Sequence, residues 1–142
     1  MTRAGDERGS GLVELTWLVV LLLVPLLYVV LTVFETQRAA YAVTSASQAA
    51  GRAFALAPDT ATADSRARAT VELTLADQGV DSDRAAVSTS CSPSCLVPGS
   101  VVEVTVTTAV PLPLLPAMFG EQPSVSVSST QLTPLGDFQE SR

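Results

Sequence analysis

The hydrophobic residues of this 142-residue chain are concentrated in one segment near its N-terminus. From Leu12 to Phe34 the sequence reads LVELTWLVVLLLVPLLYVVLTVF, and its only charged residue is Glu14. As a helix rising about 1.5 Å per residue, this segment would reach roughly 34 Å, enough to cross a hydrocarbon layer of ~30 Å. It predicts a transmembrane helix in which Pro25 causes a kink rather than a break. The segment is longer than a secretory h-region, but Ala40-Tyr41-Ala42 downstream leaves ordinary signal cleavage as an alternative.

The helix is expected to continue outside the membrane as far as Ala57. Alanine is frequent between Glu35 and Ala57, and this stretch contains no proline and one glycine, so its helix propensity is high. Pro58 disfavours the helical conformation in the residue before it. Small residues at intervals of three or four predict a helix-packing face, which either contacts other subunits or packs on the chain's own sheet. Its members are Ala39, Ala42, Ala46, Ala49 and Ala53, followed by Leu56.

A second, shorter helix is expected after Pro58. Asp59 or Thr60 can cap its N-terminus, and Gly79 fits its C-terminal stop. Its apolar residues predict one buried face. This face comprises Ala69, Leu73 and Ala76.

Three strands are expected in the remainder of the chain. Residues Ala85 to Cys91 permit a strand, and Val101 to Val110 alternates valine with polar residues. Val125 and Val127 alternate with serines in the same way. The predicted fold is therefore α+β, with a long, partly transmembrane N-terminal helix, a shorter second helix and a small antiparallel three-stranded sheet. Since the roughly 85 residues after Ala57 can build only a modest core, packing against the first helix should matter.

Cys91 and Cys95 are the only cysteines, and they bracket the turn-forming residues Ser92-Pro93-Ser94. In a compartment outside the cell they would form a disulfide that pins the turn between the first two strands. A redox-active dithiol or half of a metal site is the competing interpretation. Neither has supporting partners, because the chain contains no histidine.

The segment Leu112 to Phe119 reads LPLLPAMF and follows Pro111. The three prolines at positions 111, 113 and 116 rule out a regular helix or a central strand. The segment is either a buried connection over the sheet or an exposed apolar patch that marks a partner surface.

Charge and composition exclude several classes of function. The formal net charge is −6, and all eight basic residues are arginine. Such an acidic chain lacks the cationic surface with which proteins bind nucleic acids. With no histidine, no phosphate-binding glycine loop and no nucleotide fingerprint, the sequence predicts no enzyme, no metal, no cofactor and no small-molecule substrate.

Glu14 is the residue with the clearest candidate chemistry. A carboxylate at the start of an apolar span is unfavourable unless it reaches the headgroups, is protonated or finds a partner. The simplest interpretation is that it snorkels to the headgroup level. The alternative follows from its surroundings, Arg8-Gly9-Ser10-Gly11-Leu12-Val13-Glu14.

This motif resembles a type IV prepilin processing site, where a peptidase cuts after glycine and leaves glutamate at the fifth mature position. The resemblance places the cut after Gly9, which makes Ser10 the new N-terminus. The wider sequence resembles the TadE family of tight-adherence pilus proteins, which are pilin-like and span the membrane once. The similar segments are Glu7-Arg8-Gly9-Ser10, Val24-Pro25-Leu26-Leu27, Gln37-Arg38-Ala39-Ala40-Tyr41-Ala42 and Ala49-Ala50-Gly51-Arg52-Ala53.

The resemblance implies a minor pilin or pseudopilin that is cut by a prepilin peptidase and assembles with other pilins or pilus assembly proteins. The new ammonium of Ser10 would pair with Glu14 of a neighbouring subunit. The expected organisation is a cytoplasmic leader at 1–11, a transmembrane helix at 12–34, its extracellular continuation at 35–57 and a small extracellular α+β domain at 58–142. The alternatives are an uncleaved single-pass anchor that displays a binding domain, and a secreted domain released by signal cleavage.

Overall fold

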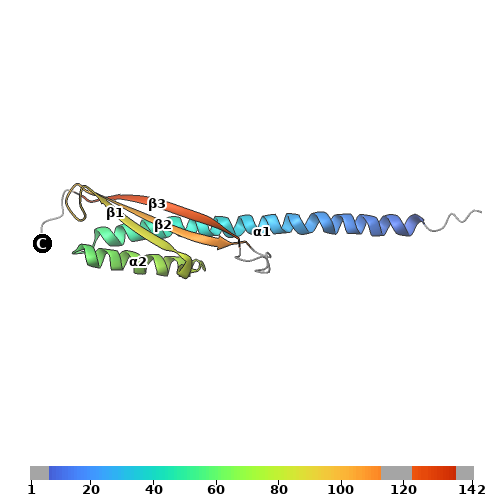
Figure 1. Ribbon diagram of the computed structural model, residues 1–142, viewed down its shortest axis with the longest axis horizontal. Helices are drawn as coiled ribbons and strands as arrows, with labels where there is room; N and C mark the ends of the chain where they lie inside the picture. The colour runs from blue at the N-terminus through green and yellow to red at the C-terminus, as the bar shows by residue number, and fades with distance from the viewer. Residues whose placement is uncertain (1–6, 113–122, 137–142) are drawn as a thin grey trace, which may run out of the picture.

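The structure, a computed structural model, describes residues 7–112 and 123–136. It confirms the α+β class, with two helices and one antiparallel sheet (Figure 1). We call the exposed apolar part of the first helix, residues 13–34, the rod, and the folded part that follows it the head. The elements in chain order are α1 (Glu7–Ala55), α2 (Thr60–Asp77), the short 3-10 helix η1 (Ser82–Arg84), β1 (Ala86–Ser92), β2 (Val101–Pro111) and β3 (Ser124–Pro134).

Helix α1 belongs to both parts of the molecule. It runs without interruption through Pro25, so the proline does not break it, as the sequence predicted. It begins five residues earlier than expected, at Glu7, and ends two residues earlier, at Ala55. Pro58 follows closely, and the last turn tightens as the amide of Ala57 donates to the carbonyl of Phe54 at 3.1 Å.

Both ends of α2 are capped as the sequence predicted. Asp59 is the N-cap, and its carboxylate accepts from the backbone N–H of Thr62 at 2.8 Å and from the Thr62 hydroxyl at 2.7 Å. These two hydrogen bonds, the backbone one first, lower the pKa of Asp59 from its ordinary value of 3.8. At the other end Gly79 has a φ of 66°. The amides of Gly79 and Val80 donate to the carbonyls of Ala76 and Leu75, both at 2.9 Å, which is a Schellman motif.

The predicted buried face of α2 is wrong. Ala69, Leu73 and Ala76 are exposed, and 67% of the Leu73 surface is accessible. The buried residues are instead Ala63, Ala67, Val71 and Leu75. Apolar residues at helical spacing lie on both sides of α2, and the packing of α2 against α1 and the shared core decides which side is covered.

The sheet has the order β1-β2-β3, and both pairs are antiparallel. In β2 burial alternates, so that Val102, Val104, Val106 and Thr108 face inward. The register places Val87 of β1 and Ser129 of β3 on either side of Val106. The alternating valines of the sequence thus form the inner face of β2, the central strand.

The core lies between this inner face and the two helices. Phe54 and Leu75 are its largest residues, and both are buried. Apart from Leu135, the other members are small or β-branched, so the layers approach closely. They include Ala42, Val43, Ala46 and Ala50 of α1, Ala63, Ala67 and Val71 of α2, and Val102, Val104 and Val106 of β2.

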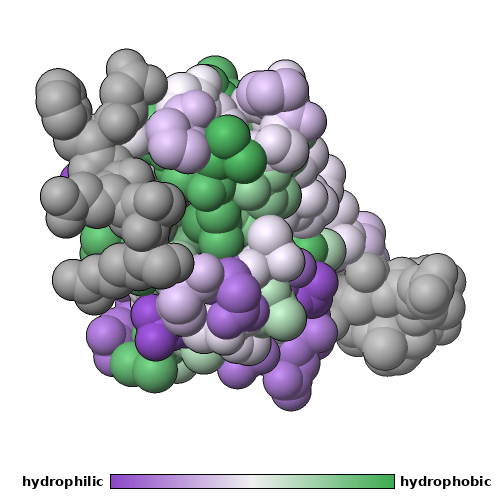
Figure 2. Space-filling model, turned by 90° about the vertical axis from the view of Figure 1, so that its left-hand side faces the viewer, coloured by the Kyte–Doolittle hydropathy of each residue, from purple (hydrophilic) through white to green (hydrophobic). Residues whose placement is uncertain are grey.

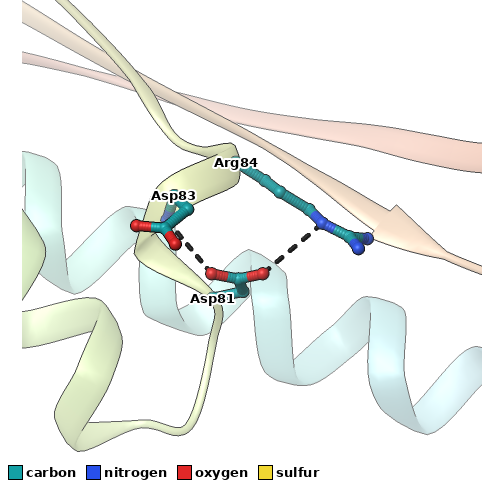
Figure 3. Close-up of polar contacts among 3 residues, drawn as sticks. All are labelled: Asp81, Asp83 and Arg84. Carbon is teal, nitrogen blue, oxygen red and sulfur yellow. Dashed lines mark hydrogen bonds and ion pairs between the residues drawn. The ribbon is translucent and has the colours of Figure 1, made fainter.

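The connection from α2 to β1 carries a local polar cap on η1. The Asp81 carboxylate accepts from the backbone N–H of Asp83 at 3.1 Å and pairs with Nε of Arg84 at 3.4 Å (Figure 3). Both side chains of the ion pair are about half exposed, so its contribution to stability is small.

Arg38 joins the first turn of α1 above the rod to the end of α2. Its Nε donates to the carbonyl of Gln78 at 2.8 Å. A positive side chain at the C-terminal end of a helix also interacts favourably with the helix dipole. A Cβ at position 79 would contact the Arg38 guanidinium, so Gly79 both ends α2 and leaves room for this contact.

Gly51 allows α1 to approach β3 closely. It is buried, and a Cβ at this position would clash with Oγ1 of Thr133. Nearby, Ser47 of α1 donates to Ser129 of β3 at 3.3 Å, so this side of α1 lies directly under β3.

We expect Gly51→Ala to destabilise the head by about 1–3 kcal/mol through overpacking against Thr133. Thermal or denaturant unfolding of the full chain in detergent micelles measures this change. Adding Thr133→Ala should recover most of the loss, because it removes the clashing hydroxyl. Gly136→Ala is the matched control, since no atom lies within 4 Å of its added Cβ. Equal stability of the Gly51→Ala and Gly136→Ala proteins would contradict the close approach.

Candidate functional site

The rod is the most unusual surface of the molecule. Its large hydrophobic side chains have between 40% and 71% of their surface exposed, from Val30 at the low end to Val13 at the high end. Figure 1 shows why: the sheet and α2 cover only the C-terminal part of α1, and the rod projects from the head as a single helix. An apolar surface of this size does not stay in water on a soluble monomer.

The length and composition of α1 are sufficient to cross a membrane. The qualifying part of the helix, Val13–Ala55, has a window of mean hydropathy 2.8, and none of that window is buried inside the protein. A core helix of a soluble protein would have its apolar window covered. The rod therefore has the properties of a single membrane-spanning segment near the N-terminus.

The residues of the predicted processing motif all lie on α1. Gly9 and Ser10 fall in its first turn, and Glu14 follows Ser10 by about one turn. The Glu14 side chain is exposed. Among the side chains of residues 13–112 and 123–136, no cation lies at ion-pair distance from Glu14. These side chains leave the carboxylate available to a partner.

The predicted alanine face is divided between two environments. Ala39, Ala42 and Ala46 are buried inside the chain's own head. Ala49 and Ala53 are half-buried, and Leu56 has 77% of its surface exposed. Ala39, Ala42 and Ala46 therefore pack against the chain's own fold. The sequence did not identify Val43, Ala50 and Phe54, which complete the buried face.

Several residues of the two predicted apolar faces that are not fully buried line one groove between α1 and α2. Ala53 and Leu56 line it from α1, and Ala69 and Leu73 line it from α2. Arg66 and Asp77 add charged groups to its walls. In the described residues, no group of three or more His, Cys, Asp or Glu side chains is arranged to hold a metal ion.

No family model, curated protein or solved structure matches the chain. Its function therefore has to be inferred from its own residues and geometry.

The end of the head away from the rod carries the disulfide. Cys91 and Cys95 are joined, with their Cα atoms 5.1 Å apart. The bond closes a small loop at the end of β1, where the connection to β2 begins, as the sequence predicted.

Figure 2 looks onto the end of the head away from the rod and shows apolar surface bordered by polar surface. Exposed apolar side chains on the elements that end there are Leu56, Val97 and Leu132.

The segment Leu112 to Phe119 is described only at its first residue. Leu112 is half-buried, and its amide donates to the carbonyl of Pro123 at 3.0 Å. This bond fixes the two ends of the β2–β3 connection next to each other. Residues 113–119 lie outside the described residues, so both interpretations of the segment stay open.

Replacing both cysteines by serine should lower the free energy of unfolding by about 2 kcal/mol, because the disulfide closes only a short loop. Denaturant unfolding of the full chain in micelles, with and without reductant, measures the loss. The reductant should affect the original chain and leave the double-serine variant unchanged. A loss above about 4 kcal/mol would contradict a purely local role for the disulfide.

Proposed function

We propose that this protein is a TadE-like minor pilin or pseudopilin, processed by a prepilin peptidase after Gly9 and assembled through its rod into a pilus or secretion filament. One observation carries the proposal: an uncovered apolar helix carries Gly9-Ser10 in its first turn and places an exposed Glu14 one turn later. A plain membrane anchor requires the apolar helix but has no use for a carboxylate inside its first turns.

The charge pairing follows from elementary electrostatics. Cleavage would create an ammonium at Ser10 at the start of an apolar helix. In hydrocarbon, that ammonium and Glu14 are each unfavourable alone and stabilise one another when they meet. Pairing across two subunits fixes their relative height, so the same contact would provide adhesion and register.

The proposed orientation places the head outside the cell. The Cys91–Cys95 disulfide supports it, since disulfides persist in oxidising compartments. The membrane would then hold residues 12–34, with the short leader on the cytoplasmic side. The proposed partners are the membrane, a prepilin peptidase and other pilins or pilus assembly proteins.

Two alternatives remain, and the geometry separates them. An uncleaved single-pass anchor is compatible with the rod and is the second candidate. Signal cleavage after Ala42 is disfavoured by the fold, because it would cut α1 inside the head. The cut would remove Arg38, which holds the end of α2, together with the buried Ala39 and Ala42.

The mature N-terminus distinguishes these functions. Mass spectrometry of the chain, purified from cells with an active prepilin peptidase, should give a protein that starts at Ser10. Gly9→Leu should block the cut, because a large side chain no longer fits a site that accepts glycine. An intact N-terminus in both proteins would support the anchor, and a start at Val43 would support secretion.

Glu14→Ala should spare membrane insertion and reduce incorporation into filaments at least tenfold, since it leaves the Ser10 ammonium without its partner. Quantitative immunoblotting of sheared filaments against the membrane fraction gives this ratio. Glu35→Ala is the matched control, because Glu35 is also an exposed carboxylate on α1 but lies at the other end of the rod. Unchanged incorporation of the Glu14→Ala protein would overturn the charge pairing.

A further inference from the structure

The two sides of the rod differ in chemistry. Starting from Glu14 and stepping by three or four residues, one face of the helix collects most of its non-aliphatic side chains. We call this face the polar stripe. It consists of Glu14, Leu18, Leu21, Pro25, Tyr28, Thr32 and Thr36. The opposite face is aliphatic between Thr16 and Phe34, which lie at its two ends, and there it includes Val19, Leu23, Leu26, Val30 and Val33.

The polar stripe carries hydrogen-bonding groups that hydrocarbon cannot satisfy. Pro25 has no N–H, so the carbonyl of Leu21 lacks its helical donor. Tyr28 offers a phenol that can donate and accept. The hydroxyls of Thr32 and Thr36 donate to the carbonyls of Tyr28 and Thr32, at 2.9 and 2.8 Å, which leaves their oxygens as acceptors. A second helix against this stripe would satisfy these groups, whereas the aliphatic face suits lipid.

The stripe is continuous with the face of α1 that the head covers. The same spacing leads from Thr36 to Ala39, Val43, Ala46, Ala50 and Phe54, which are all buried. The valines of β2 lie over these residues in one core. The outer face of the sheet therefore looks to the same side of the helix as the polar stripe of the rod.

The outer face of the sheet is almost free of charge. The three strands carry a single charged residue, Glu103, in a chain of net charge −6. Hydroxyl groups dominate this face, and those of Thr105 and Thr130 are 2.8 Å apart. Two copies of such a face can meet with little like-charge repulsion. Its hydroxyl-bearing residues are Ser88, Ser90, Thr105, Thr107, Ser126, Ser128 and Thr130.

We propose that two copies of this chain associate in the membrane through the polar stripe, with the outer faces of their sheets opposed above it. A two-fold axis along the membrane normal keeps both rods pointing in the same direction. Because each sheet lies between its own helices and the axis, the rods cross at the level of Leu21 and Pro25 and diverge toward the heads. The Tyr28 hydroxyl supplies the donor for the carbonyl that Pro25 frees in the other copy. This dimer does not require cleavage at Gly9, so it goes beyond the proposed function and is tested separately from it.

Disulfide cross-linking of the uncleaved full chain in phosphatidylcholine–phosphatidylglycerol vesicles tests the proposal. The native cysteines are already paired with each other, so a single added cysteine reports on contact between copies. Leu18→Cys and Leu21→Cys, on the stripe and close to the crossing, should give cross-linked dimer at least fivefold more efficiently than Val19→Cys and Leu23→Cys at the same height on the opposite face. Equal efficiency on both faces, or no cross-linked dimer from the stripe, would overturn the interface.

A second pair of variants tests the sheet contact. Ser128→Arg, added to the Leu21→Cys chain, should lower its cross-linking severalfold, because two guanidinium groups would meet across the axis. Ser65→Arg is the matched control, since Ser65 is an exposed serine on α2, away from the sheet. Tyr28→Phe should also lower cross-linking by removing the donor. If Ser128→Arg has no more effect than Ser65→Arg, the opposed sheets are ruled out.

Discussion

The architecture depends on one helix that lies in two different environments. The N-terminal part of α1 exposes an unbroken apolar surface, and the C-terminal part is buried in a protein core. None of the described residues of the head covers the rod, so its apolar surface suits hydrocarbon or other apolar helices. The amino-acid choice changes accordingly, from large aliphatic residues that lipid surrounds to alanine and Gly51, which let β3 and α2 approach closely.

A continuous helix also fixes how the head sits on the rod. The face that the sheet covers at Ala46 and Ala50 continues into the face that carries Tyr28 and Thr32. Arg38 adds a second connection by holding the end of α2 just above the rod. An event at the membrane level, such as pairing of Glu14 with a partner, would therefore set the rotation and height of the whole head.

The placement of charge follows the same organisation. In the part of the head that the structure describes, every charged residue except Glu103 lies on the helices or the segments that connect them, and the sheet carries only Glu103. The helices thus provide solubility for a head that stands on an apolar rod, while the sheet presents neutral hydroxyl groups. Such a division suits a protein that works beside copies of itself, since neighbours can approach the sheet without repulsion.

The sequence by itself determined the rod, both ends of α2, the three strands and the cysteine pair. Each depends on local chemistry: apolar length, a capping carboxylate, Gly79, valine alternation, or two thiols four residues apart. Only the tertiary structure decided which face of α2 is buried. The apolar residues on the side of Leu73 and those on the side of Leu75 predict a buried face equally well from the sequence. The tertiary structure also decided that Ala39, Ala42 and Ala46 pack in their own head. Which of several apolar faces is covered depends on contacts between distant segments, and these have no local signature in the sequence.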